Sequence, residues 1–173
     1  DLRDGAVLER GCVYVVPLLE ELHLKSGVIA FANPKSSTGR LDILTRLIGD
    51  RSSHFDRLER GYQGPLYVEI APRTFSVVVH AGSRLNQLRF RRGSPVIAVS
   101  ELQRLHDSGQ LVFADDSAQD FSERKMLRLS VDLHGEGPGS LIGYRAKKHT
   151  DRIDFEKIAH YDPTDFWEPI NDN

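Results

Sequence analysis

The chain has 173 residues, of which 39% are hydrophobic, a composition typical of a globular protein with one ordinary core. Its 23 basic and 25 acidic residues give a net charge of −2. The chain therefore lacks the overall positive field that a long polyanion requires, and no nucleic-acid partner is expected.

Cysteine content and hydropathy restrict the class of protein and the compartment in which it is expected. Cys12 is the only cysteine, which excludes an internal disulfide and a cysteine-rich zinc site and favours a reducing, cytoplasmic setting. No apolar run approaches the roughly 18 residues that span a bilayer, and no signal core is evident, so no membrane partner is expected. Because the chain starts at Asp1 and residues 7–17 already have a strand pattern, we interpret it as a fragment or processed chain.

The first half of the chain consists of short β-rich segments separated by Gly, Pro, Ser and Asn. The expected strands are residues 12–16, 28–32, 41–47, 66–70, 75–80 and 85–90. Many short strands without a helical period between them predict a mainly β, antiparallel sandwich or barrel-like fold.

The pattern changes at residues 93–98, which predicts a boundary between a domain of residues 1–96 and a second domain of residues 97–173. A serine cap, Leu102 and Leu105 on one side, and a final glycine predict a short helix over residues 100–109. The segments expected after it are a polar loop at 114–125, strands at 127–133 and 141–145, and an aperiodic, aromatic tail at 151–173, whose Phe166 and Trp167 are expected to pack.

Two segments carry candidate chemistry. Residues 32–43 place hydroxyls, a glycine and two cations between strands, and such a loop offers N–H groups and positive charge to phosphate, although a solvated turn is the alternative. In the strand at 66–70, alternation puts Tyr67 and Glu69 on one face. Glu69 therefore faces either a cavity or solvent, the commoner position for a glutamate.

Three segments in this order resemble the conserved boxes of the dUTPase and dCTP deaminase superfamily, over roughly residues 5–92. Residues 35–40 resemble its phosphate-binding Arg-Ser-Ser box, 61–64 its nucleoside-binding hairpin and 82–90 its Arg-(Ile/Leu)-x-Gln strand. The resemblance implies a dUTPase-like β-barrel or β-clip fold with a short helix.

Two spacings resemble the deaminase branch. Glu69 follows the hairpin aromatic Tyr62 by seven residues, and Arg40 follows Ser36 by four. The resemblance implies metal-free hydrolysis of dCTP to dUTP and ammonia, which would supply dUTP for thymidylate synthesis. Glu69 would act as general base and then acid, while Ser36 and Arg40 would orient the water and the developing charge.

The other predicted site residues bind substrate, and all except Gly49 and Arg51 are implied by the resemblance. They are Lys35, Ser37, Gly39, Gly49, Arg51, Tyr62 and Gln87. Lys35 replaces the family's arginine and would offer a point charge instead of a bidentate fork. The stretch between Arg40 and Gly61 is longer than in single-domain deaminases, and residues 49–51 are our prediction for reading the cytosine edge.

A zinc mechanism is not expected. His134 and Glu136 resemble the His-x-Glu half of a zinc deaminase, but no Pro-Cys-x-x-Cys follows, so no protein-bound zinc is predicted. Mg²⁺ is expected to accompany the triphosphate of the substrate.

The second half of the chain resembles the beginning of the same fold. The helix at 100–108 and the Val-Asp strand pattern at 129–133 suggest parts of two tandem repeats, as in the long bacterial dCTP deaminases. Because superfamily sites lie between subunits, a homo-oligomer with sites between subunits or repeats is expected. Two alternatives remain: a dUTP diphosphatase or bifunctional enzyme that uses Glu59, and a non-catalytic nucleotide-binding module.

Overall fold

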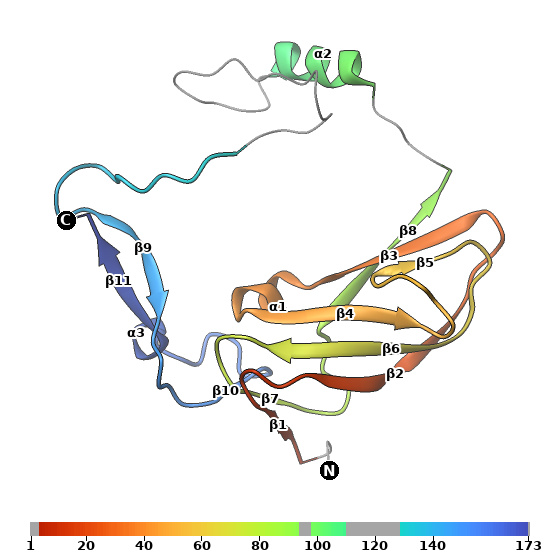
Figure 1. Ribbon diagram of the computed structural model, residues 1–173, viewed down its shortest axis with the longest axis horizontal. Coiled ribbons are helices and arrows are strands. Elements are labelled where there is room, and N and C mark those ends of the chain that lie inside the picture. The colour runs from red at the N-terminus through yellow and green to blue at the C-terminus, as the bar shows by residue number, and fades with distance from the viewer. Residues whose placement is uncertain (1–3, 94–97, 110–128, 173) are drawn as a thin grey trace. The chain divides into compact units, whose positions relative to one another are not determined.

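The computed structural model describes residues 4–93, 98–109 and 129–172, and it is mainly β, as expected (Figure 1). The strands are β1 Ala6–Leu8, β2 Tyr14–His23, β3 Val28–Pro34, β4 Ile43–Gly49, β5 Arg57–Leu58, β6 Gln63–Pro72, β7 Val77–Val79, β8 Asn86–Arg92, β9 Leu141–Ala146, β10 Ile153–Asp154 and β11 Trp167–Asn171. The helices are α1 Ser36–Arg40, α2 Val99–Gly109 and α3 Pro163–Phe166.

The strands form small sheets, which are antiparallel except where β10 runs parallel to β7. In one sheet, β6 lies between β2 and β4; in another, β3 lies between β5 and β8. The remaining orders are β1-β7-β10 and β9-β11. Strand β2 changes register between Pro17 and Glu21, where a bulge bends it along β6.

The alternating side chains of β4 and β6 fill two cores. Ile43, Val68 and Ile70 pack with Phe75 and Val77 in the first. The second core holds Leu47 and Leu66 and is completed by Leu24, Ala30, Ala32 and Leu58. The β2-β6-β4 sheet therefore buries one face, and the opposite face carries Tyr67 and Glu69, as the alternation predicts.

The chain divides into two compact units: Asp1–Gly93 with Gly143–Ile170, and Ser94–Ile142 with Asn171–Asn173. Residues from the second half of the chain thus complete the core of the first unit, since Ile153 and Phe166 are buried there. The predicted domain boundary between residues 96 and 97 lies outside the described residues and stays a prediction, as does the tandem repeat.

Several predicted elements differ from the structure. Residues 41–42 form a turn after a helix instead of starting a strand, and β2 runs to His23, well past the predicted end at residue 16. Helix α2 is confirmed but begins at Val99, so Ser100 lies inside it and is not the cap. The strand predicted at 127–133 is wrong over its described part, because residues 129–133 have no regular structure. The loop predicted at 114–125 lies outside the described residues. None of the helices described here is long and apolar enough to cross a membrane.

Candidate active site

The predicted phosphate loop forms a short helix, α1, whose buried side is hydrogen-bonded to the backbone carbonyl of Leu85. Thr38 is fully buried, and its hydroxyl donates a hydrogen bond of 2.8 Å to the carbonyl of Leu85. The backbone N–H of Lys35 donates to the same carbonyl at 2.9 Å. The helix positions that remain exposed are Ser36, Ser37, Gly39 and Arg40. The anchoring residue is thus Thr38, and the residues predicted to contact substrate stay accessible.

Strand pairing brings Gln87 close to α1. Gln87 on β8 is opposite Asn33 on β3, just before Lys35, and its side-chain amide lies 3.5 Å from the carbonyl of Pro34. The first and third family-like segments are therefore neighbours in space. Lys35, Gln87 and the exposed face of α1 form one group of predicted site residues, which we call the α1 group.

Gly49, Arg51 and Tyr62 form a second group, at the far end of β4. The N–H of Asp50 donates to the Tyr62 hydroxyl at 2.8 Å, and that hydroxyl donates to the carbonyl of Pro65. A Cβ atom at Gly49 would lie 2.6 Å from the Leu58 side chain and 3.0 Å from the Tyr62 ring, so the glycine lets both side chains approach the strand. Arg51 has a φ of 56° and a side chain that is 93% exposed. This Tyr62 group is built by the close packing of a hairpin against β4.

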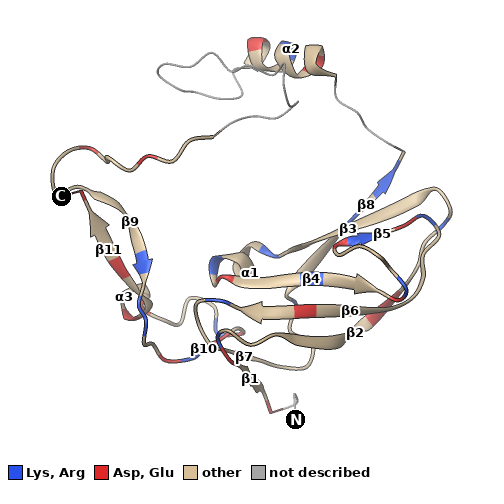
Figure 2. Ribbon diagram, in the orientation of Figure 1, with Lys and Arg blue, Asp and Glu red and all other residues tan. Residues whose placement is uncertain are grey.

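Glu69 lies between the two groups, in the middle of β6. Only 14% of its side chain is exposed. Arg46 on β4 is directly opposite Glu69 in the antiparallel pairing of β4 with β6. Figure 2 shows a basic position on β4 beside an acidic one on β6. Two hydrogen bonds, from Nε at 2.8 Å and from a terminal nitrogen at 2.6 Å, join the guanidinium to Glu69. Glu69 is thus a held carboxylate and not a freely solvated one.

The α1 group and the Tyr62 group lie at opposite ends of β4. Strand β4 separates the α1 group from the Tyr62 group, and six residue steps at about 3.3 Å each amount to about 20 Å. Within the described chain no hydrogen bond joins Glu69 to Ser36 or Arg40.

Reasoning from the sequence missed Arg46 and Phe55. The Arg46 guanidinium carbon lies 3.9 Å from the centre of the Phe55 ring, so Glu69, Arg46 and Phe55 follow one another in contact. Arg46 is the one charged residue of the 43–49 strand, and this was the available signal, because a charged residue in a half-buried strand needs a partner on a neighbouring strand.

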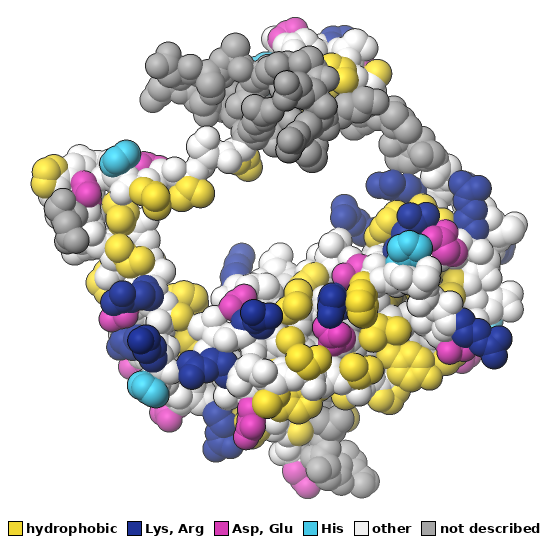
Figure 3. Space-filling view, in the orientation of Figure 1, with side chains coloured by type: hydrophobic (Ala, Val, Ile, Leu, Met, Phe, Trp, Pro, Cys, Tyr) yellow, Lys and Arg dark blue, Asp and Glu magenta, His cyan; other side chains and the backbone are white. Residues whose placement is uncertain are grey.

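The sheet face around Glu69 is apolar and partly open. Val15 on β2 is opposite Glu69 and is 61% exposed, while Leu44 on β4 is 40% exposed. Figure 3 shows hydrophobic side chains gathered over β2, β4 and β6, interrupted by charged ones. Glu69 and Arg46 thus lie among partly exposed apolar side chains.

A polar cavity of about 780 Å³ lies elsewhere in the first unit, among residues that include Arg10, Ser76, Lys148 and Tyr161. None of the predicted site residues lines it. In the part of the chain that is described, no group of three or more His, Cys, Asp or Glu side chains is arranged to hold a metal ion.

Comparison with known proteins decides the family. Residues 1–94 match the family model for the N-terminal domain of 2′-deoxycytidine 5′-triphosphate deaminase (DCD), and residues 98–173 match that for its C-terminal domain. The chain belongs to the DCD family. The family resemblance inferred from the three sequence boxes is thereby confirmed.

A solved DCD structure gives the same assignment. The crystal structure of 2′-deoxycytidine 5′-triphosphate deaminase from Agrobacterium tumefaciens is similar to this chain over its whole length, with 50% sequence identity and a TM-score of 0.88. The fold is therefore the dUTPase-like fold that the resemblance implied. This chain spans 51% of that DCD chain, about half of its length.

Proposed function

We propose that the protein that contains this chain hydrolyses dCTP to dUTP and ammonia. Membership of the DCD family supports the reaction. The observation that carries it is Glu69, a carboxylate that is fixed on one side by Arg46 and lies seven residues after Tyr62. A carboxylate held in a partly closed, largely apolar surface is suited to repeated proton transfer.

In this mechanism Glu69 moves one proton. It accepts the proton from a water molecule while the water oxygen bonds to C4 of cytosine, and it then donates the proton to the 4-amino nitrogen. The C4–N bond breaks, ammonia leaves, and the remaining hydroxyl proton transfers to N3 to give the uracil ring. Ser36 orients the water, and Arg40 stabilises the charge that develops on the ring.

The exposed groups at the two ends of β4 bind the rest of the nucleotide in this proposal. Lys35, Ser37 and Gly39 contact phosphate oxygens with Mg²⁺ on the triphosphate. Gln87 joins them, while Tyr62, Gly49 and Arg51 contact the nucleoside. Because about 20 Å of β4 separates these groups, each complete site forms between subunits or repeats of an oligomer. No zinc takes part.

We propose a cytoplasmic setting, in which the product dUTP feeds thymidylate synthesis. Cys12 is a free, exposed thiol, which agrees with a reducing compartment. No nucleic-acid partner is needed for this role.

Product analysis tests the proposed reaction. We would incubate the purified protein with dCTP or dUTP and Mg²⁺ and quantify ammonia, dUTP, dUMP and pyrophosphate. Ammonia and dUTP from dCTP are expected. Pyrophosphate from dUTP would instead reveal the diphosphatase, and dCTP binding without any product would identify a non-catalytic module.

Two matched glutamate variants assign the proton transfer. Glu69→Gln keeps the shape of the side chain but removes the proton carrier, so ammonia release should fall about 10²- to 10⁴-fold with nucleotide binding retained. Glu59→Gln is the control for deamination, because Glu59 lies 57% exposed in an ion pair with Arg57. More than about a tenth of wild-type turnover in Glu69→Gln would remove Glu69 from the mechanism.

A further inference from the structure

One oxygen of Glu69 accepts both hydrogen bonds from Arg46. Nε of Arg46 donates to Oε1 at 2.8 Å, and a terminal guanidinium nitrogen donates to the same oxygen at 2.6 Å. Within the described residues, Oε2 accepts no hydrogen bond. The two carboxylate oxygens therefore differ: Oε1 is occupied, and Oε2 is free for a water molecule or a substrate.

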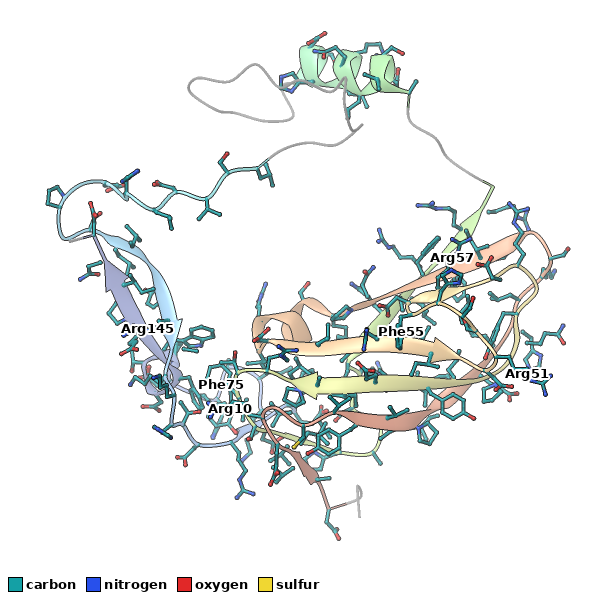
Figure 4. All side chains as sticks on the ribbon, in the orientation of Figure 1. Arg10, Arg51, Phe55, Arg57, Phe75 and Arg145 are labelled. Carbon is teal, nitrogen blue, oxygen red and sulfur yellow. The ribbon has the colours of Figure 1, made fainter. Side chains whose placement is uncertain are left out.

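Phe55 is a second contact of the Arg46 guanidinium. The guanidinium carbon lies 3.9 Å from the ring centre, the distance of a cation–π contact, and Figure 4 labels Phe55 next to β4. The Arg46 side chain is 39% exposed. Without its contacts to Glu69 and Phe55, such a side chain would populate several rotamers. The ring contact at the guanidinium and its two hydrogen bonds to Glu69 together restrict its orientation.

The segment that carries Phe55 is itself tied to β4. The N–H of Asp56 donates to the carbonyl of Leu47 at 2.9 Å, and the N–H of Leu47 donates to the carboxylate of Asp56 at 2.7 Å. Asp56 thus binds the residue next to Arg46 through both of its backbone groups. This clamp places Phe55 over Arg46 even though Phe55 is 47% exposed.

We propose that Arg46 is a positioning residue for the proton transfer, held in place by Phe55. Arg46 fixes the carboxylate of Glu69 through Oε1 and leaves Oε2 as the oxygen that exchanges a proton with water and then with the amino group. A guanidinium is suited to this role because it cannot give up its own proton near neutral pH. The inference rests on the proposed function, since it assigns a task to Glu69 in that reaction.

Kinetics of Arg46→Met tests the inference, because methionine keeps an unbranched chain of similar reach and removes both donors. A misplacement of about 1 Å can cost about 10²-fold in rate, so we expect kcat to fall about 10- to 100-fold. KM should stay within about threefold, because the interaction serves the transition state and not the bound substrate. Arg46→Lys, which restores one charged donor, should recover part of kcat.

Arg145→Met is the matched control. Arg145 on β9 also donates its Nε to a glutamate on a neighbouring strand, Glu168 on β11, at 2.7 Å. Its side chain is 71% exposed, and it belongs to neither the α1 group nor the Tyr62 group. Loss of a cross-strand arginine as such should therefore leave kcat unchanged.

Phe55→Ala tests whether the ring acts through Arg46. Alone it should lower kcat about three- to tenfold, since the guanidinium gains freedom but keeps its hydrogen bonds. In an Arg46→Met background, the same change should have no further effect on kcat. If Phe55 acts only through Arg46, the effects of the two changes on the activation free energy do not add. Additive losses would show that Phe55 has a separate role and would overturn that part of the inference.

The outcomes separate this inference from the proposed function. If wild-type protein releases no ammonia, or if Glu69→Gln stays active, the proposed function or its mechanism fails. If Glu69→Gln is inactive while folded Arg46→Met keeps more than half of wild-type kcat, or changes KM alone, only the role of Arg46 fails. Should Arg46→Met not fold, unchanged kcat in both Arg46→Lys and Phe55→Ala would overturn the inference equally.

Discussion

The ring of Phe166 meets the ring of Phe75 edge-on, with centroids 5.7 Å apart and planes at 89°. Both side chains are almost fully buried, and Trp167 meets Phe75 in a similar geometry at 5.4 Å. Residues near the end of the chain thus close a core that begins in its first half. The prediction that Phe166 and Trp167 pack is confirmed.

Phe166→Ala should lower the free energy of unfolding by about 3 to 5 kcal/mol, because it removes a buried ring and leaves a cavity. Urea denaturation followed by tryptophan fluorescence measures the change, since Trp167 lies beside the cavity. Phe90→Ala is the control, because Phe90 is 57% exposed and its loss should cost less than about 1 kcal/mol. Equal losses in both variants would contradict the packing role.

The contribution of Asp162 to stability should disappear in acid. The backbone N–H of Thr164 and then its hydroxyl, at 2.9 and 2.8 Å, hold the pKa of the Asp162 carboxyl below its usual 3.8. A carboxylate with a lower pKa in the folded state stabilises the protein above pH 3.8, and the contribution is lost as pH falls through the folded value.

Urea denaturation of Asp162→Ala between pH 3 and pH 7 measures this effect. The difference from wild type should be constant from about pH 5 upward and should shrink below pH 3.8. Asp151→Ala is a control, because the exposed Asp151 forms no hydrogen bond or ion pair in the described part of the chain. A difference that grows in acid would show that Asp162 is not an ionised cap.

Arg40 and Lys35 should separate kinetically if the proposed roles are right. Arg40→Ala removes a transition-state interaction and should lower kcat, as should Ser36→Ala, whereas Lys35→Ala removes phosphate binding and should raise KM. The effect at Lys35 should be smaller with dCMP than with dCTP. Steady-state kinetics with both nucleotides measures it, and similar increases in KM alone for both variants would make Arg40 another phosphate ligand.

The active protein should be an oligomer that uses the apolar face of the β2-β6-β4 sheet. Val15→Lys puts a charge on this face and should reduce the mass found by light scattering, because burial of an unpaired charge is costly. Ile158→Lys is the control, since Ile158 is 90% exposed and lies outside this sheet. A fully active wild-type monomer would contradict the shared-site proposal.

The sequence determined the fold class and the family. Alternation in residues 66–70 correctly predicted that Tyr67 and Glu69 share a face, because strand geometry alone fixes that relation. The order and spacing of three short boxes were sufficient for the family, since the residues within each box are close neighbours along the chain. The failure at residues 129–133 shows the limit: a strand pattern needs a partner strand, and the described residues provide none there.

Only the tertiary structure revealed the Arg46 and Phe55 pair around Glu69. Their contacts depend on the register of β4 against β6 and on the Asp56 clamp, and neither follows from local preferences. The structure likewise placed Ile153 and Phe166 in the first unit. Local pattern selects strands and helices, but the pairing of distant segments is decided by which apolar faces can be buried together and which charges then find partners.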